Sequence, residues 1–152
     1  MSYVENNLLV GESMTYRAKL HWIIFMRGGF FVITAIIALV FLESPYNQYL
    51  GSFLFLLAIF YLITPVIEFY SNEFAVTNKR LIVKTGFIRI NSLEILLSKV
   101  EGIQVNQSIL GRILGYGSIT ITGTGGSRDP YLNIAEPLEF RKKAQEQIST
   151  SS

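Results

Sequence analysis

The sequence predicts an α+β membrane protein, in which a transmembrane hairpin of two helices precedes a small, bent antiparallel β-sheet or partial barrel capped by a C-terminal helix. Three observations predict this fold class. Residues 22–42 and 50–67 are apolar runs, and about 20 helical residues are enough to cross the hydrocarbon core of a bilayer. From residue 71 onward, short β-like segments alternate with turn residues. The chain closes with a helical pattern that begins at Pro137.

The composition limits the chain to one small domain and an anchor. Its 152 residues are too few for two independent hydrophobic cores. Half of the residues are hydrophobic and 16% are charged, and most of the charges lie outside the two apolar runs. The chain contains no cysteine, which excludes disulfide bonds, thiol catalysis and cysteine-ligated metal sites.

Residues 1–21 are expected to form a cytoplasmic N-terminal segment, and residues 22–70 the transmembrane hairpin. The first run is longer than the roughly 7–15 apolar residues of a signal peptide, and no A-x-A cleavage pattern follows it. Instead, a short turn that contains Pro45 and Asn47 leads to the second run. We therefore expect a retained helix rather than a cleaved signal.

Lysine and arginine residues near the ends of the runs predict the orientation. Arg17, Lys19 and Arg27 lie before or within the first run, the connecting turn has none, and ten more follow from Lys79 onward. Both termini are therefore expected in the cytoplasm and the turn outside. Arg27 is close enough to the end of the run to reach the headgroups, with Glu68 available as an ion-pair partner, and a coupling role inside the membrane is the alternative.

The segments after residue 71 predict antiparallel strands at 73–77, 80–85, 87–97 and 100–107. Asn78 and Lys79 fit a two-residue hairpin loop between the first two strands, because Asn tolerates a positive φ. In the fourth strand the apolar residues change phase, which indicates a β-bulge at Glu101 and Gly102.

A corner and two further strands follow. Residues 108–115 are too short and too rich in glycine for a stable helix, and they predict a single turn or corner. Ile alternates with Ser and Thr in a strand at 118–122. The glycine-rich residues 123–130 fit either a phosphate-binding loop or a hairpin connection, and the connection is favoured because an edge strand at 131–134, rather than a helix, follows.

The last element is a helix that starts at Pro137, with Glu136 as its cap. An apolar stripe that recurs every four residues marks the face that packs on the sheet: Phe140, Ala144 and Ile148. We place the domain at residues 71–149 and a short tail at 150–152.

Two segments of this module are similar to a known family. The runs FAVTNKRLIVKTG at 74–86 and LSKVEGIQVNQS with LGRILGYG at 97–117 resemble the opening and central segments of bacterial PH-like domains. The resemblance covers about residues 70–150, and two preceding transmembrane helices are common in that family. It implies a pleckstrin-homology-like fold of seven strands with a C-terminal helix, so that the segment 87–97 holds a break near Asn91. It also implies a multi-pass protein of the bacterial cytoplasmic (inner) membrane.

Enzymatic chemistry has few candidate residues. His21 is the one histidine and Asp129 the one aspartate, and a Ser–His–Asp arrangement would have to unite the start of the first run with a distant loop. An interfacial His21 and a turn-forming Asp129 are the simpler interpretation. No His, Asp or Glu residues have metal-ligand spacing. We therefore expect no enzyme activity and no catalytic, cofactor or metal site.

The basic residues of the module give weak but useful evidence about what it binds. Residues 68–152 hold ten Lys and Arg against eight Asp and Glu, too small an excess for nucleic-acid binding. Eukaryotic PH domains often bind phosphoinositides through several basic residues around the first hairpin, where this chain offers only Lys79, Arg80 and Lys84. A tight inositol phosphate pocket is therefore not expected.

Strand geometry separates the basic residues into two groups. The first strand starts beside the membrane and carries its hairpin loop about 16 Å away, at about 3.3 Å per residue. Candidate membrane-facing residues are therefore Lys84, Phe87, Arg89 and Arg27. Lys79 and Arg80 are candidate partner-facing residues. The alternative is that the charges of the strands are solvated edge residues without a ligand.

These observations predict a non-enzymatic integral membrane protein that displays a PH-like domain at the cytoplasmic face as an adaptor. A protein partner, or further copies of the chain, would add a strand to a sheet edge or contact the C-terminal helix. The alternative is binding of anionic lipid headgroups by the domain. Transport is the weakest hypothesis, because it would need an oligomer, and Thr34 and Thr64 are the sole polar candidates near the middle of the spans or beyond.

Overall fold

The computed structural model describes residues 3–41, 43, 45–127 and 130–151. The chain forms two compact units, a mixed unit of residues 1–21 with 71–152 and a helical unit of residues 22–70. Asp129, predicted to form a turn, lies outside the described residues, and so does the end of the predicted tail at residue 152.

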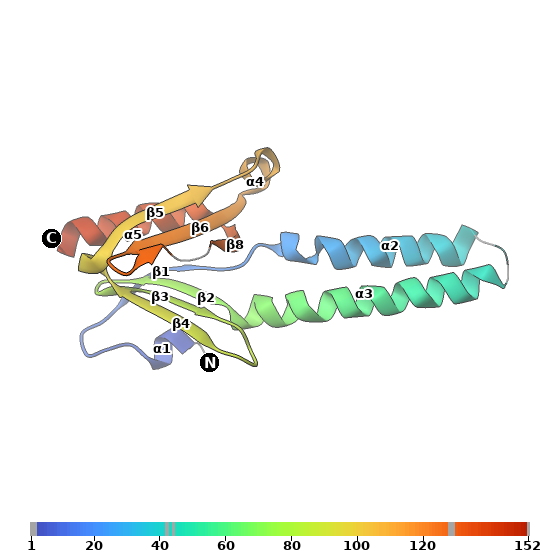
Figure 1. Ribbon diagram of the computed structural model, residues 1–152, viewed down its shortest axis with the longest axis horizontal. Coiled ribbons are helices and arrows are strands. Elements are labelled where there is room, and N and C mark those ends of the chain that lie inside the picture. Colours follow the sequence, from blue (N-terminus) through green and yellow to red (C-terminus); the bar gives the residue numbers. More distant parts are fainter. Residues whose placement is uncertain (1–2, 42, 44, 128–129, 152) are drawn as a thin grey trace. The chain divides into compact units, whose positions relative to one another are not determined.

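The helical unit is a pair of helices packed side by side (Figure 1). It contains η1 (Trp22–Phe25), α2 (Met26–Phe41) and α3 (Tyr46–Ser71). A Cβ atom at Gly28 would collide with the side chain of Leu62, so the missing side chain allows the two helices to approach closely. The rings of Phe31 and Tyr61 stack across the pair with centroids 4.8 Å apart.

Both helices have the length and composition of membrane spans. Trp22–Phe41 covers 20 residues and Gln48–Ser71 covers 24. In the most apolar stretch of the second helix only 11% of the residues are buried, whereas the core helix of a soluble protein is mostly buried. The second helix continues to Ser71, four residues beyond the predicted run at 50–67.

The first sheet of the mixed unit, sheet A, has four antiparallel strands in chain order: β1 (Met14–Ala18), β2 (Glu73–Thr77), β3 (Arg80–Thr85) and β4 (Asn91–Leu96). Ala18 at the end of β1 pairs with Phe74 at the start of β2, although the whole helical unit lies between them in the sequence. The helices therefore take the place of the turn in a β-hairpin. The segment 1–21, expected to lie apart from the domain, supplies its first strand.

The second sheet, sheet B, follows a corner formed by η2 (Leu97–Lys99). It consists of β5 (Val100–Asn106), β6 (Tyr116–Gly123), β7 (Gly126–Ser127) and β8 (Tyr131–Ala135), and the short helix α4 (Ile109–Leu114) joins β5 to β6. A register shift between Val100 and Gly102 confirms the predicted bulge. The predicted strand at 87–97 is shorter in the structure: β4 begins only at Asn91 and residues 87–90 form a loop, so the segment holds one strand and not two.

Two local predictions need correction. The segment 108–115 is more than a single turn or corner, because it contains the six-residue helix α4. The Ser108 hydroxyl caps this helix by accepting a hydrogen bond from Gly111 N. Asn78 does not adopt a positive φ. Its side chain instead binds the N-terminal segment, accepting a hydrogen bond from Ser13 N at 2.9 Å and donating one to Gly11 O at 3.2 Å.

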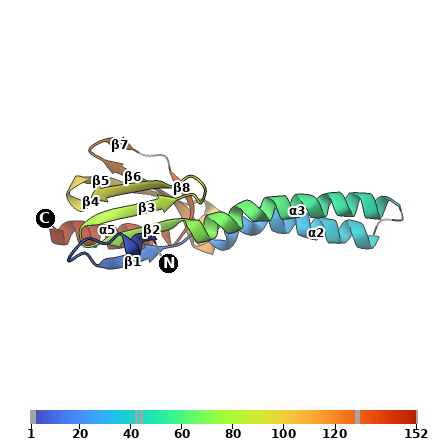
Figure 2. The same ribbon diagram turned by 90° about the horizontal axis from the view of Figure 1, so that it is seen from below.

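The last helix, α5 (Pro137–Ser151), starts at the predicted proline and continues past the predicted end of the domain at 149. It contacts strands of both sheets, and Figure 2 shows it running along the mixed unit. Phe140 and Ala144 are fully buried, as the apolar stripe predicted. They join the core residues on the inner faces of the sheets: Phe74, Val76, Leu81, Val83, Ile119, Ile121 and Ile134.

The outer face of sheet A is covered by the N-terminal residues 3–13, here called the N-terminal arm. Its first part is the short helix α1 (Tyr3–Asn6), whose Val4 is fully buried with Ala75 and Ile82. As a result, all five residues of β2 are buried, because β2 is covered on both faces. The α+β fold class is thus confirmed, and the arm and β1 are additions to it.

Candidate binding surfaces

The strand order gives the mixed unit two ends. The chain leaves β1 after Ala18 and enters β2 at Glu73, so both connections to the helices lie at one end, here called the junction end. The opposite end, here called the corner end, holds the β2–β3 turn and the η2 corner, which are joined by a hydrogen bond from Leu97 N to Lys79 O at 3.1 Å. Each predicted site residue of the domain can be assigned to one of these two ends.

The β3–β4 loop, residues 86–90, lies at the junction end, because β3 runs antiparallel to β2 and ends beside its start. Gly86 adopts a left-handed φ of 85° and donates its N–H to Asn72 Oδ1 at 2.9 Å. The Lys84 Nζ atom donates to Ser71 O at 2.7 Å. One hydrogen bond therefore holds the loop to Asn72, which directly follows α3, and a second holds the adjoining end of β3 to Ser71, the last residue of α3.

The side chains at the tip of this loop are open to solvent. Phe87 is 67% exposed and Ile88 is 95% exposed, with the exposed Arg89 next to them. Of the three predicted membrane-facing residues in the domain, Phe87 and Arg89 are therefore free to contact a ligand, whereas Lys84 is partly occupied by Ser71 O. Ile88 was not among the predicted membrane-facing residues.

Arg27, the fourth predicted membrane-facing residue, lies in the helical unit near the start of α2. Its side chain is exposed and lines a shallow cleft with Phe30, Phe31 and Tyr61. In the part of the chain that the structure describes, Arg27 and Glu68 make no ion pair. The ion pair available in the sequence analysis is thus absent from this pair of helices.

Arg80, predicted to face a partner, is instead enclosed by its own chain. Its guanidinium binds both carboxylate oxygens of Glu12, from Nε at 3.0 Å and from Nη2 at 3.1 Å. It also pairs with Glu94 and donates to Asn7 O. Only 11% of the Arg80 side chain is exposed, so the arm covers the group expected to bind a partner.

Glu12 is the buried counterpart of Arg80, with a fully covered side chain. Burial by itself would raise the pKa of Glu12, but hydrogen bonds from Leu9 N, the Thr77 hydroxyl and Arg80 outweigh it and hold the pKa below its usual value. The carboxylate therefore stays ionised, and this ion pair fastens the arm to sheet A at the corner end. The sequence carried no signal for it.

Lys79, the other predicted partner-facing residue, lies at the corner end and is exposed. Its Nζ atom donates to Val10 O at 2.7 Å and adds a further link to the arm. At the junction end, Glu73 accepts hydrogen bonds from Tyr3 N and Val4 N and pairs with Arg17. Arg80 and Lys79, the two predicted partner-facing residues, thus both hold the arm in place.

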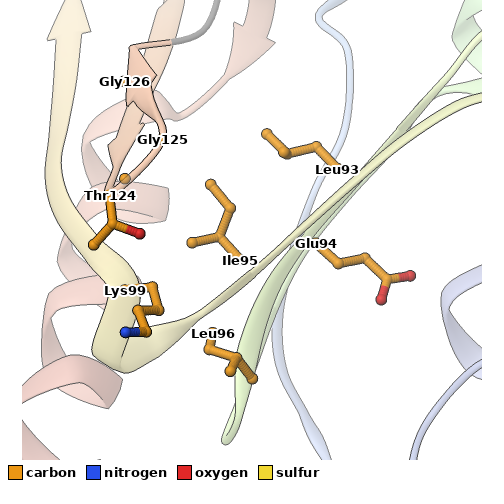
Figure 3. Close-up of a pocket in the computed structure, with 9 residues that line it drawn as sticks. Leu93, Glu94, Ile95, Leu96, Lys99, Thr124, Gly125 and Gly126 are labelled. Carbon is orange, nitrogen blue, oxygen red and sulfur yellow. The ribbon is translucent and has the colours of Figure 1, made fainter.

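An open groove of about 290 Å³ lies between β4 and the β6–β7 turn (Figure 3). Leu93 and Ile95 project into it from β4, and Lys99 and Thr124 lie on the other side. Among the described strands, β4 pairs only with β3, so the edge of β4 beside the groove is unpaired. The groove therefore combines apolar side chains with free backbone groups. The sequence predicted a sheet edge as a binding site but not which edge.

His21 occupies a structural position in the mixed unit. Its ring stacks on Tyr116 with centroids 5.3 Å apart, and its backbone N–H donates to Asn133 O at 2.6 Å. Within the described residues, no group of three or more His, Asp or Glu side chains is arranged to hold a metal ion.

The two sheets and their capping helix, with a free strand edge and an exposed loop, form a domain of the binding type. The sequence matches the bacterial PH domain family over residues 28–148, and the chain belongs to this family. The resemblance noted in the sequence is thereby confirmed. Comparisons with curated proteins and with solved structures found no match.

Proposed function

We propose that this chain is a non-enzymatic adaptor, anchored in the bacterial cytoplasmic membrane by α2 and α3, that displays its PH domain on the cytoplasmic side. The observation that carries the proposal is the unpaired edge of β4 beside the apolar groove. An extended segment of a protein partner, or of a second copy, adds a strand to this edge and places alternate side chains in the groove. Confinement to the membrane raises the effective concentration of both partners.

Two features support β4 over other surfaces of the domain. The outer face of sheet A is closed by the N-terminal arm, and the inner faces form the core. The edge strand β4, in contrast, carries Leu96, which is 53% exposed on the face turned away from the groove, and the groove offers the ammonium group of Lys99 for an acidic side chain or a chain terminus. Free strand edges with apolar neighbours are the usual site of strand addition.

Photo-crosslinking tests this site in the full-length protein within its native membrane. A photoreactive amino acid at Leu96 is compared with one at Leu9, a residue of the same type and the same 53% exposure on the N-terminal arm. We expect an adduct at Leu96 only, and its loss in the variant Ile95→Lys, which places a charge in the groove. An adduct of twice the chain mass identifies self-association. Equal labelling at Leu96 and Leu9, or an adduct that survives Ile95→Lys, contradicts strand addition at β4.

Recognition of anionic lipid is the second candidate function, and the exposed pair Phe87 and Arg89 favours it. Each basic residue close to an anionic leaflet contributes about 1 kcal/mol to binding. The test is charge reversal in the full-length protein, with Arg89→Glu compared with Lys142→Glu on the exposed face of α5. Loss of function in the first variant alone supports lipid recognition, and equal tolerance of both variants argues against it.

A further inference from the structure

The short helix α4 presents an unusual surface to solvent. Ile109 is 79% exposed and Ile113 is 74% exposed, and Leu110 and Leu114 are also exposed. Four large aliphatic side chains therefore face outward from a helix of six residues. Exposed apolar clusters of this kind mark contact sites for proteins or membranes.

The position of α4 in the domain indicates which contact it makes. Tyr116, two residues after α4, stacks on His21, the residue immediately before the first candidate span at Trp22. A hydrogen bond from Ala135 N to Lys19 O at 2.9 Å fastens the neighbouring strand β8 to the same segment. The apolar helix thus lies at the junction end, where the chain passes into the first of the two apolar helices.

The β3–β4 loop places a second apolar cluster at the same end. Phe87, Ile88 and Ile90 are exposed, and the loop is hydrogen-bonded through Gly86 to Asn72, which directly follows α3. Figure 1 shows α4 and the connection between β3 and β4 at one end of the mixed unit, away from the C-terminus of α5. One cluster comes from sheet A and the other from sheet B, so together they span this end of the domain.

The charges around the two clusters suit a lipid surface. Residues 84–93 and 107–118 contain three basic residues and no acidic one. Of these three, Arg89 and Arg112 stand within the apolar clusters. Arg112 also lines a shallow cleft with Glu136 and Glu139, so at α4 we expect insertion of the aliphatic side chains to contribute more than charge. Apolar side chains beside arginines are typical of groups that enter the interface between headgroups and acyl chains.

We propose that α4 and the β3–β4 loop are two apolar prongs that enter the cytoplasmic leaflet and fix the orientation of the domain on the membrane. This inference rests on the membrane anchoring of the proposed function and adds a contact that the anchor alone does not require. With both prongs in the lipid, the β4 groove keeps one fixed orientation relative to the membrane surface. The aliphatic residues of α4 then have an apolar environment instead of water.

Single-cysteine labelling tests the proposal, because the natural chain has no other cysteine. The full-length variants Ile113→Cys and Ile88→Cys carry an environment-sensitive fluorophore in vesicles of phosphatidylcholine and phosphatidylglycerol. Val10→Cys is the matched control, an apolar residue that is 98% exposed but contacts Lys79 at the corner end. Phe53→Cys, within α3, reports the membrane anchor itself.

We expect nitroxide-labelled lipids to quench most of the fluorescence at residues 113 and 88, and iodide in the water to quench little. The label at residue 10 should show the opposite behaviour. Lipid quenching at residue 53 together with iodide quenching at residues 113 and 88 contradicts the insertion of α4 and the β3–β4 loop, but it is consistent with the membrane anchor. Protection of 113 and 88 from both quenchers indicates a protein contact and also overturns the proposal. Iodide quenching at residue 53 overturns the anchor and the prongs together.

Discussion

At the scale of single residues, the pair formed by Glu12 and Arg80 explains how the N-terminal arm stays on sheet A. The two residues are 68 positions apart, and no local pattern relates them. From the sequence, Arg80 was therefore predicted to be an exposed group for a partner, whereas in the structure it neutralises a buried carboxylate. A charged residue next to a turn looks the same in sequence whether it faces water or a distant segment of its own chain.

This pair predicts an acid-dependent stability. The folded-state pKa of Glu12 lies below its usual value of 4.5, so the stabilisation is fully present above that pH. It is lost as the pH falls through the lowered pKa. In the variant Glu12→Gln, we expect a loss of about 2 kcal/mol in the free energy of unfolding at neutral pH, because Arg80 loses the charge of one of its two carboxylate partners and keeps only Glu94. The variant should also lose part of the acid dependence.

Chemical denaturation of the purified full-length protein in detergent, followed by circular dichroism between neutral and acidic pH, measures both effects. The exposed Glu101, mutated to Gln, serves as the control. If Glu101→Gln and Glu12→Gln lower the stability equally, the ion pair does not fasten the arm.

At the scale of elements, the close approach of α2 and α3 predicts unequal effects at two adjacent glycines. A Cβ atom at Gly28 meets Leu62, whereas one at Gly29 has nothing within 4 Å. We expect Gly28→Val to destabilise the helical pair by about 1–3 kcal/mol, and Gly29→Val to change it little. Thermal unfolding of the two full-length variants, measured by circular dichroism in the same detergent, gives the comparison. Equal unfolding temperatures would show that the helices do not pack through Gly28.

The elements that the sequence predicts well are those with a local signal. The two apolar helices, the β2–β3 hairpin, the bulge after Val100 and the start of α5 each follow from residues next to one another in the chain. β1 has no such signal. It is five residues long, and its partner β2 begins only after the helical unit, so its role becomes visible only from the pairing of Ala18 with Phe74.

The sequence predicted less of the candidate binding surfaces than of the helices and strands. The basic and aromatic residues of the β3–β4 loop stood out because strand geometry placed that loop at the end nearest the apolar helices. The exposure of Ile88 and Ile113 could not be predicted, because an isoleucine in a short segment is usually buried. The β4 groove depends on how two sheets separate, and this distance is not encoded in any single strand.

At the scale of the whole molecule, the domain is assembled from two segments on either side of a helical hairpin. Removal of residues 1–12 is therefore expected to destabilise the domain rather than trim a tail. It exposes Ala75 and Ile82, removes Glu12 and the Asn7 carbonyl from Arg80, and removes the backbone donors of Tyr3 and Val4 from Glu73. Limited proteolysis of full-length and shortened chains in membranes measures the effect. Equal resistance to cleavage within residues 73–135 would contradict a structural role of the arm.

We propose that the two apolar helices form a membrane hairpin inserted between two paired strands of one binding domain. The most direct test of this proposal is the topology of the full-length protein in cells, determined with a membrane-impermeant maleimide and single cysteines. We expect Val10→Cys and Thr124→Cys to react only after the cells are permeabilised, whereas Tyr46→Cys, at the start of α3, reacts in intact cells. Because β1 and β2 pair, residues 10 and 124 must lie on the same side of the membrane. Labelling of these two positions from opposite sides would contradict a membrane hairpin between β1 and β2.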